Sequence, residues 1–110
     1  MSEQVCVVLT TCPDEGTAER LAAVLVEQRL AACVSAGSPA RSIYPWQGRI
    51  EKEEEVPLTI KTTAGCLEQL KRVLVENHPY DVPEVLALPV IDGLDDYTQW
   101  IRDWINDDNA

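Results

Sequence analysis

The chain has 110 residues and a mass of 12.2 kDa, which is the size of one domain, so we treat residues 1–110 as a single domain. Nine Lys and Arg against 19 Asp and Glu give a net charge of −10. This balance argues against nucleic-acid binding, which needs a basic face, and against docking on an anionic membrane. No apolar run approaches the roughly 20 residues that span a bilayer, and the polar start does not resemble a signal peptide. We therefore expect a cytoplasmic protein whose four cysteines are free thiols.

The first third of the chain predicts a strand, a helix and a second strand. Residues 5–11 form a β-branched apolar run, which is typical of a buried strand. Asp14 is suited to cap a helix from about residue 14 to about residue 30, because apolar residues recur there at three- and four-residue spacing. Residues 31–36 predict the second strand.

The middle of the chain predicts a long β-hairpin. Residues 42–46 and 49–62 are extended in character, and Gly48 lies between them, where a tight turn needs a positive φ. Pro45 and Pro57 cannot donate to a strand ladder, so both should mark edges or bulges. The four glutamates between residues 51 and 55 could attract cations, but such a run is more often the solvated face of an exposed hairpin.

The last third predicts a helix over residues 64–77, a strand over 85–91 and a closing helix after Gly93. Pro89 indicates that the strand lies at an edge. Strands connected through helices in this order favour an α+β fold of the ferredoxin-like βαββαβ type. We expect an antiparallel sheet with helices on one face and an extra C-terminal helix.

One loop, residues 78–84, gathers side chains that could carry chemistry. His78 is the one histidine of the chain and a candidate metal ligand or proton carrier, with Tyr80, Asp81 and Glu84 as oxygen donors. The alternative is structural: His78 caps its helix and Tyr80 packs over the core. The glycines are scattered and form no phosphate-binding loop, and a zinc-protease helix would need two histidines.

The hairpin predicts self-association. Its arms, residues 40–46 and 49–60, are longer than a four-stranded sheet of this size needs, and an isolated two-stranded ribbon is marginally stable in water. Trp46 at the tip is poorly buried by its own chain, which is typical of a partner surface. We expect a homotrimer in which Tyr44, Trp46 and Arg49 lie at the interface, because head-to-tail closure removes exposed edges without starting a fibre.

Four ordered motifs, residues 29–34, 42–51, 58–62 and 78–84, resemble the CutA family of divalent-cation tolerance proteins. The resemblance extends from residue 7 to about residue 105. It implies a ferredoxin-like fold, a homotrimer similar in architecture to the PII signalling proteins, and a cytoplasmic role in copper or heavy-metal tolerance. It implies no established catalytic activity, so the chain is not expected to be an enzyme.

The resemblance also implies roles for individual residues. His78 matches a histidine proposed as a copper ligand, whereas Thr10 and Asn77 stand where some relatives have a cysteine and a second histidine. We therefore expect copper or another divalent cation to bind only weakly. Lys61, with the loop residues Tyr80, Asp81 and Glu84, is expected to line a cleft between subunits.

Three functions remain open from the sequence. The first is a trimeric protein that binds divalent metal weakly and contributes to metal tolerance. The second is a PII-like signalling or scaffold trimer that takes a small anionic ligand through Lys61, an analogy at the level of the fold. The third, least favoured, is an acid–base enzyme that uses His78 with Asp81 or Glu84.

Overall fold

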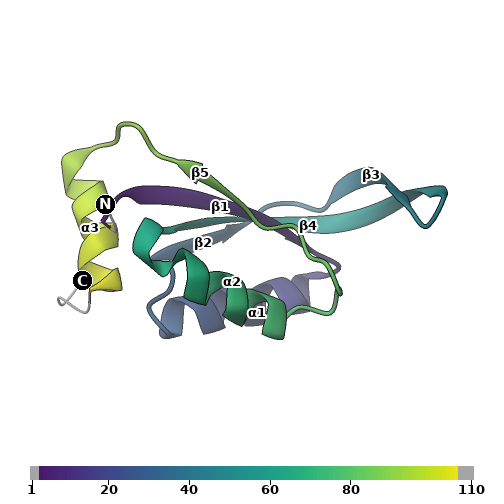
Figure 1. Ribbon diagram of the computed structural model, residues 1–110, viewed down its shortest axis with the longest axis horizontal. Helices are drawn as coiled ribbons and strands as arrows, with labels where there is room; N and C mark the ends of the chain where they lie inside the picture. The colour runs from purple at the N-terminus through teal and green to yellow at the C-terminus, as the bar shows by residue number, and fades with distance from the viewer. Residues whose placement is uncertain (1–2, 107–110) are drawn as a thin grey trace.

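The computed structural model describes residues 3–106 and consists of one five-stranded antiparallel sheet with three α-helices (Figure 1). The elements are β1 (Val5–Cys12), α1 (Glu15–Glu27), β2 (Cys33–Ala36), β3 (Ala40–Trp46), β4 (Arg49–Thr63), α2 (Leu67–Glu76, after a 3-10 turn at Ala64–Cys66), β5 (Leu86–Pro89) and α3 (Asp95–Ile105). The strand order is β2-β4-β1-β5, and β3 pairs with the outer half of β4. This confirms the predicted ferredoxin-like α+β fold with an extra C-terminal helix.

Helices α1 and α2 pack on one face of the sheet (Figure 1). Alternate side chains of β1 point toward them, because successive residues of a strand face opposite sides. The core between the two layers is aliphatic. Its fully buried members include Val8, Leu21, Leu25, Leu58, Ile60, Leu70 and Leu74.

Helix α3 covers only one end of the opposite face. Ile101 packs there with Val5 and Ala32 in a second buried cluster. The helix is fixed by Trp104, whose Nε1 donates to the Val26 carbonyl at 3.1 Å, and by Arg29, whose guanidinium lies 3.7 Å from the Trp104 ring centroid. The rest of this sheet face has no helix over it in the described chain.

Helix α1 ends three residues before the predicted position. Arg29 takes a positive φ of 58°, and the amides of Leu30 and Ala31 both donate to the Leu25 carbonyl, so the chain turns away at the end of the helix. Strand β2 accordingly begins at Cys33 rather than at residue 31. Strand β5 is also shorter than predicted, at Leu86–Pro89.

Two of the three prolines predicted to mark strand edges or bulges lie in edge strands, and the third, Pro57, does not. Pro45 lies in β3 and Pro89 in β5, and each of these strands pairs on one side only, as predicted. Pro57 instead lies inside the central strand β4, opposite Thr11 of β1. On its other side β2 ends opposite Leu58 and β3 begins opposite Glu55, so no ladder hydrogen bond is required of its nitrogen.

The β3–β4 hairpin projects beyond the layered body, and the molecule measures 46 × 26 × 24 Å along its principal axes (Figure 1). Gln47 and Gly48 both have positive φ at the tip, 49° and 81°. This matches the two-residue turn that the glycine predicted. Among residues 3–106, no helix has the length and apolar composition needed to cross a membrane.

Candidate functional site

The register of the hairpin places three glutamates on one of its faces. Residues directly opposite each other on paired strands point to the same side. Glu51 lies opposite Tyr44, and Glu53 lies opposite Ser42, with Glu55 two residues further on. We call this side the acidic face of the hairpin.

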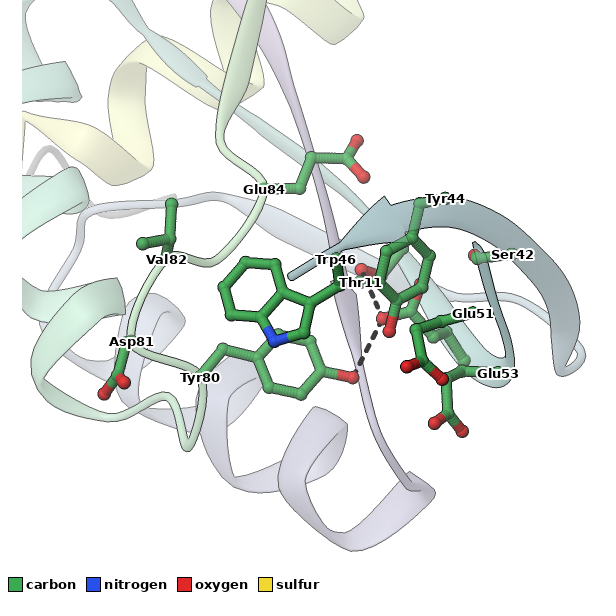
Figure 2. A pocket seen from close by; sticks show the side chains of 11 residues that line it. Thr11, Ser42, Tyr44, Trp46, Glu51, Glu53, Tyr80, Asp81, Val82 and Glu84 are labelled. Atoms are coloured by element: carbon green, nitrogen blue, oxygen red, sulfur yellow. Dashed lines mark hydrogen bonds between the residues drawn. The ribbon is translucent and has the colours of Figure 1, made fainter. Parts of the chain in front are cut away.

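A cavity of about 560 Å³ lies between the acidic face and the loop that follows α2 (Figure 2). Five carboxylate residues line it: Glu51, Glu53, Glu55, Asp81 and Glu84. Three aromatic residues line it as well: Tyr44, Trp46 and Tyr80. None of the described residues lining the cavity is a lysine or an arginine, so its chemistry suits cations rather than anions.

The Glu55 side chain connects the hairpin to β1 and to the loop after α2. Its side chain is only 7% exposed, and its Oε2 accepts hydrogen bonds from the Tyr80 hydroxyl at 2.8 Å and the Thr11 hydroxyl at 3.2 Å (Figure 2). Burial, together with this bond to the glutamate, raises the pKa of Tyr80 well above its usual range, so the phenol stays a donor. The expectation of a fully solvated glutamate run is therefore wrong at Glu55, because this residue lies where the hairpin meets the body and Thr11 and Tyr80 cover it.

His78 lies beneath the same loop and is 8% exposed. Its Nε2 lies 2.7 Å from the Thr11 carbonyl oxygen, and its Nδ1 accepts the Tyr80 backbone N–H at 3.1 Å. A carbonyl oxygen can only accept, so Nε2 carries a proton. Nδ1 accepts a hydrogen bond and therefore carries none, so the imidazole in this arrangement is neutral. Both nitrogens are thus engaged with the main chain, and His78 can bind a metal only after giving up one of these bonds.

His78 does not act as the helix cap that the structural alternative proposed. Asn77 is the C-cap residue of α2, and its Nδ2 donates to the Val73 carbonyl at 2.8 Å. The His78 ring instead packs against Tyr80, with the centroids 4.7 Å apart. His78 thereby joins the loop to the end of β1.

Lys61 lies elsewhere in the chain. It faces the side of the sheet away from α1 and α2, with Val7 and Cys33 as its neighbours in register, and its ammonium lies 5.6 Å from the Tyr97 ring centroid. It does not line the cavity with Tyr80, Asp81 and Glu84. One chain therefore brings three of the four predicted cleft residues together and leaves Lys61 apart.

The predicted interface residues lie at the outer end of the hairpin. Trp46 is 48% exposed and forms a wall of the cavity, and Arg49 forms a surface ion pair with Glu51 at 3.7 Å. Tyr44 is half-buried on the acidic face, where burial and the neighbouring glutamates raise its pKa. A single chain does not test their role in assembly, which stays a prediction.

The donor set for a metal ion is incomplete within one chain. Residues 3–106 contain no group of three or more His, Cys, Asp or Glu side chains placed to hold an ion. Cys12 is buried, and burial raises the pKa of its thiol to about 11, which keeps it protonated and a poor ligand. Thr10 is buried with its hydroxyl unpartnered. These residues do not fit a tight metal site.

Thr11 and Ser42 were not predicted from the sequence as parts of this site, and Glu55 was considered only as one member of the glutamate run. A signal was available for Glu55, because Glu51, Glu53 and Glu55 share the parity of a strand and must lie on one face. Nothing local pointed to Thr11, which reaches the cavity only through the pairing of β1 with β4.

The chain is similar to proteins of one family over nearly its whole length. Residues 6–104 match the family described as CutA1 divalent ion tolerance protein. The divalent-cation tolerance protein CutA of Pectobacterium atrosepticum is 46% identical over 96 residues, which cover 87% of each chain. The crystal structure of CutA from Xylella fastidiosa is 43% identical, with a TM-score of 0.91, and covers 93% of this chain and 98% of that one. A CutA from Archaeoglobus fulgidus, described as periplasmic, is 31% identical, with a TM-score of 0.89 and coverages of 92% and 98%.

Proposed function

This chain belongs to the CutA1 divalent ion tolerance protein family, and from that premise we propose that it is a cytoplasmic homotrimer that binds a divalent metal ion, copper included, weakly. The observation that carries the metal proposal is the cavity beside Glu55, lined by five carboxylates and by no basic side chain among the described residues. Carboxylate oxygens bind divalent cations, and the net charge of −10 raises their local concentration.

His78 is the nitrogen ligand that we propose for a copper ion, because imidazole binds Cu(II) better than carboxylate does. Its two hydrogen bonds to the main chain support weak rather than tight binding, since one of them must break first. Asp81 and Glu84, on the same loop, are the oxygen ligands that we propose. They line the cavity and His78 does not, so the loop would have to rearrange before all three could reach one ion.

Calorimetric titration with Cu²⁺ tests this assignment. Wild-type protein should bind weakly, and His78→Ala should reduce the affinity further, whereas Asn77→Ala, a change at the adjacent exposed position, should leave it unchanged. A further variant, Glu53→Gln, tests whether a carboxylate of the acidic face binds the ion. If Glu53→Gln weakens binding and His78→Ala does not, the ion lies at the acidic face and the role of His78 as a ligand is wrong. Circular dichroism of each variant controls for loss of the fold.

The homotrimer is supported by surfaces that one chain leaves uncovered. The sheet face opposite α1 and α2 exposes Leu86 and Leu88, and the hairpin projects from the body with Ile43 and Ile50 exposed. Apolar surface of this extent is typical of an interface. Light scattering coupled to size exclusion should give three times the chain mass of 12.2 kDa, and a monomer would contradict the proposal.

The cytoplasmic location is supported by the cysteines. All four are free thiols, which suits a reducing compartment. One relative in the family is described as periplasmic. Cell fractionation with antibody detection tests the proposal, and recovery in a periplasmic fraction would contradict it.

A PII-like trimer that takes a small anionic ligand is the second candidate. It is favoured by Lys61, a cation on the uncovered sheet face that a neighbouring copy would turn into part of a cleft. A phosphate-bearing probe that stabilises wild-type protein but not Lys61→Gln would support it. We propose no catalytic activity, since the hydrogen bonds of the His78 ring go to the main chain rather than to Asp81 or Glu84.

A further inference from the structure

We infer that the cavity beside Glu55 is a binding site for an organic cation, namely an aliphatic amine with a charged ammonium group at each end. The inference goes beyond the proposed metal binding, although it concerns the same cavity. It gives a role to the aromatic rings that line this cavity, whereas the metal proposal uses only carboxylates and His78.

The cavity is larger than one hydrated metal ion. Its volume is about 560 Å³. Six waters, the shell that surrounds an octahedral ion such as Mg²⁺, take up roughly 180 Å³ at the volume of liquid water. Small organic ligands bind in cavities of roughly 300–1,000 Å³. The volume therefore suits a small organic molecule.

Three aromatic rings line the cavity beside its carboxylates. Tyr44 and Trp46 belong to β3, and Tyr80 belongs to the loop after α2 (Figure 2). The face of an aromatic ring attracts a cation, and the methylene groups of an amine also pack against it. A divalent ion such as Mg²⁺ gives up its water reluctantly and gains less from such a wall. The rings therefore favour an organic cation.

Glu55 supplies a fixed carboxylate with one oxygen to spare. The side chain is buried, and the Tyr80 and Thr11 hydroxyls both donate to its Oε2. Within residues 3–106, no group donates a hydrogen bond to Oε1, and no lysine or arginine pairs with this carboxylate. A buried carboxylate without a cation partner is costly. An ammonium group at Oε1 would supply both the hydrogen bond and the positive charge.

The carboxylates lie on two walls, which favours a ligand with two charges. They are Glu51, Glu53 and Glu55 of β4, and Asp81 and Glu84 of the loop after α2. In the view of Figure 2, the Tyr80 ring lies between Asp81 on the loop and Glu53 on the hairpin. A diamine can place one ammonium group at each wall while its methylene chain passes the rings.

Calorimetric titration with the diamine putrescine at physiological ionic strength tests the inference. One putrescine should bind per chain, and the uncharged diol of the same length should not bind. Glu55→Gln removes the charge and keeps an acceptor oxygen, and it should weaken binding about tenfold or more. Should Glu55→Gln not fold, Glu53→Gln is the milder variant of the same wall, with a loss of up to about fivefold. Glu54→Gln is the matched control, because this adjacent exposed residue does not line the cavity, and it should leave the affinity unchanged.

The aromatic rings have a readout of their own. In proton NMR spectra, the methylene signals of bound putrescine should shift upfield, because the ring faces shield them. Trp46→Leu should reduce this shift and weaken binding about two- to fivefold. Trp46→Phe also loses the indole but keeps a ring, so it should retain most of both effects. Circular dichroism and light scattering check that the two variants match in fold and assembly.

Two results would overturn the inference. One is putrescine that binds no more tightly than the diol. The other is a Glu54→Gln variant that loses as much affinity as Glu53→Gln, because the net charge of −10 would then attract the amine without a site. Titration of the same protein with Cu²⁺ separates the two proposals. Copper binding without putrescine binding overturns this inference alone, and putrescine binding without copper binding overturns the proposed metal binding alone.

Discussion

Replacing Tyr80 by phenylalanine removes one oxygen atom, and with it the hydrogen bond that ties the 78–84 loop to the hairpin. The Tyr80 hydroxyl donates to Glu55 Oε2 at 2.8 Å, and Glu55 is 7% exposed. A hydrogen bond to a charged group contributes about 1.5–3 kcal/mol to stability. The Thr11 hydroxyl remains as a donor at 3.2 Å, so we expect a loss near the lower end, about 1.5 kcal/mol.

Urea denaturation at a fixed protein concentration measures this loss, because assembly makes stability depend on concentration. Glu55→Gln and the double variant complete a double-mutant cycle, in which Tyr80 and Glu55 should couple by about 1 kcal/mol. Thr63→Ser, away from the cavity, is a control for a small change at a buried residue that keeps its hydroxyl. A loss below about 0.3 kcal/mol with no coupling would refute the claim that this contact holds the cavity together.

The same hydrogen bond predicts that the stability of the fold changes with pH in alkaline solution. The pKa of Tyr80 is raised in the folded state, so its contribution to stability is fully present below the ordinary tyrosine pKa of about 10 and is lost as pH rises through the folded-state value. The stability difference between wild type and Tyr80→Phe should therefore shrink above about pH 10. In a spectrophotometric titration, the variant should lack the last tyrosine to ionise.

Three further predictions follow from single residues. Leu74→Ala removes a fully buried side chain between the helices and the sheet, and should cost about 3 kcal/mol in chemical denaturation. The thiol of Cys12, whose pKa burial raises to about 11, should resist a thiol reagent at pH 8 until denaturant is added, whereas the half-buried Cys33 should react in the native protein. The Asp14 carboxylate caps α1 by accepting the Thr17 N–H at 2.7 Å, which lowers its pKa. Its stabilising effect should be present above about pH 4 and be lost as pH falls, so thermal melts of wild type and Asp14→Ala should converge in acid.

Local signals predicted most of the fold. Gly48 indicated the hairpin turn, Asp14 the start of α1, and Pro89 an edge strand, and each is confirmed. The early end of α1 was not predictable from periodicity, because it depends on the positive φ of Arg29 and on contacts with α3. Tertiary contacts decide such boundaries.

The candidate site was predicted in part. The loop from His78 to Glu84 is one wall of the cavity, but the opposite wall comes from β4, and sequence spacing does not reveal how far β4 runs along β1. That register buries Glu55 beside Thr11, and it also places Lys61 on the far side of the sheet. The hydrogen bonds of the His78 ring depend on the same long-range pairing.

Native mass spectrometry of the purified protein, with and without added Cu²⁺, tests the central claim most directly, because one spectrum reports both assembly and metal binding. The proposed function predicts a single major species of three chains of 12.2 kDa each, with copper adducts that appear on titration and disappear after mild desalting. A monomer that acquires no copper would contradict the proposed trimer and the proposed metal binding together.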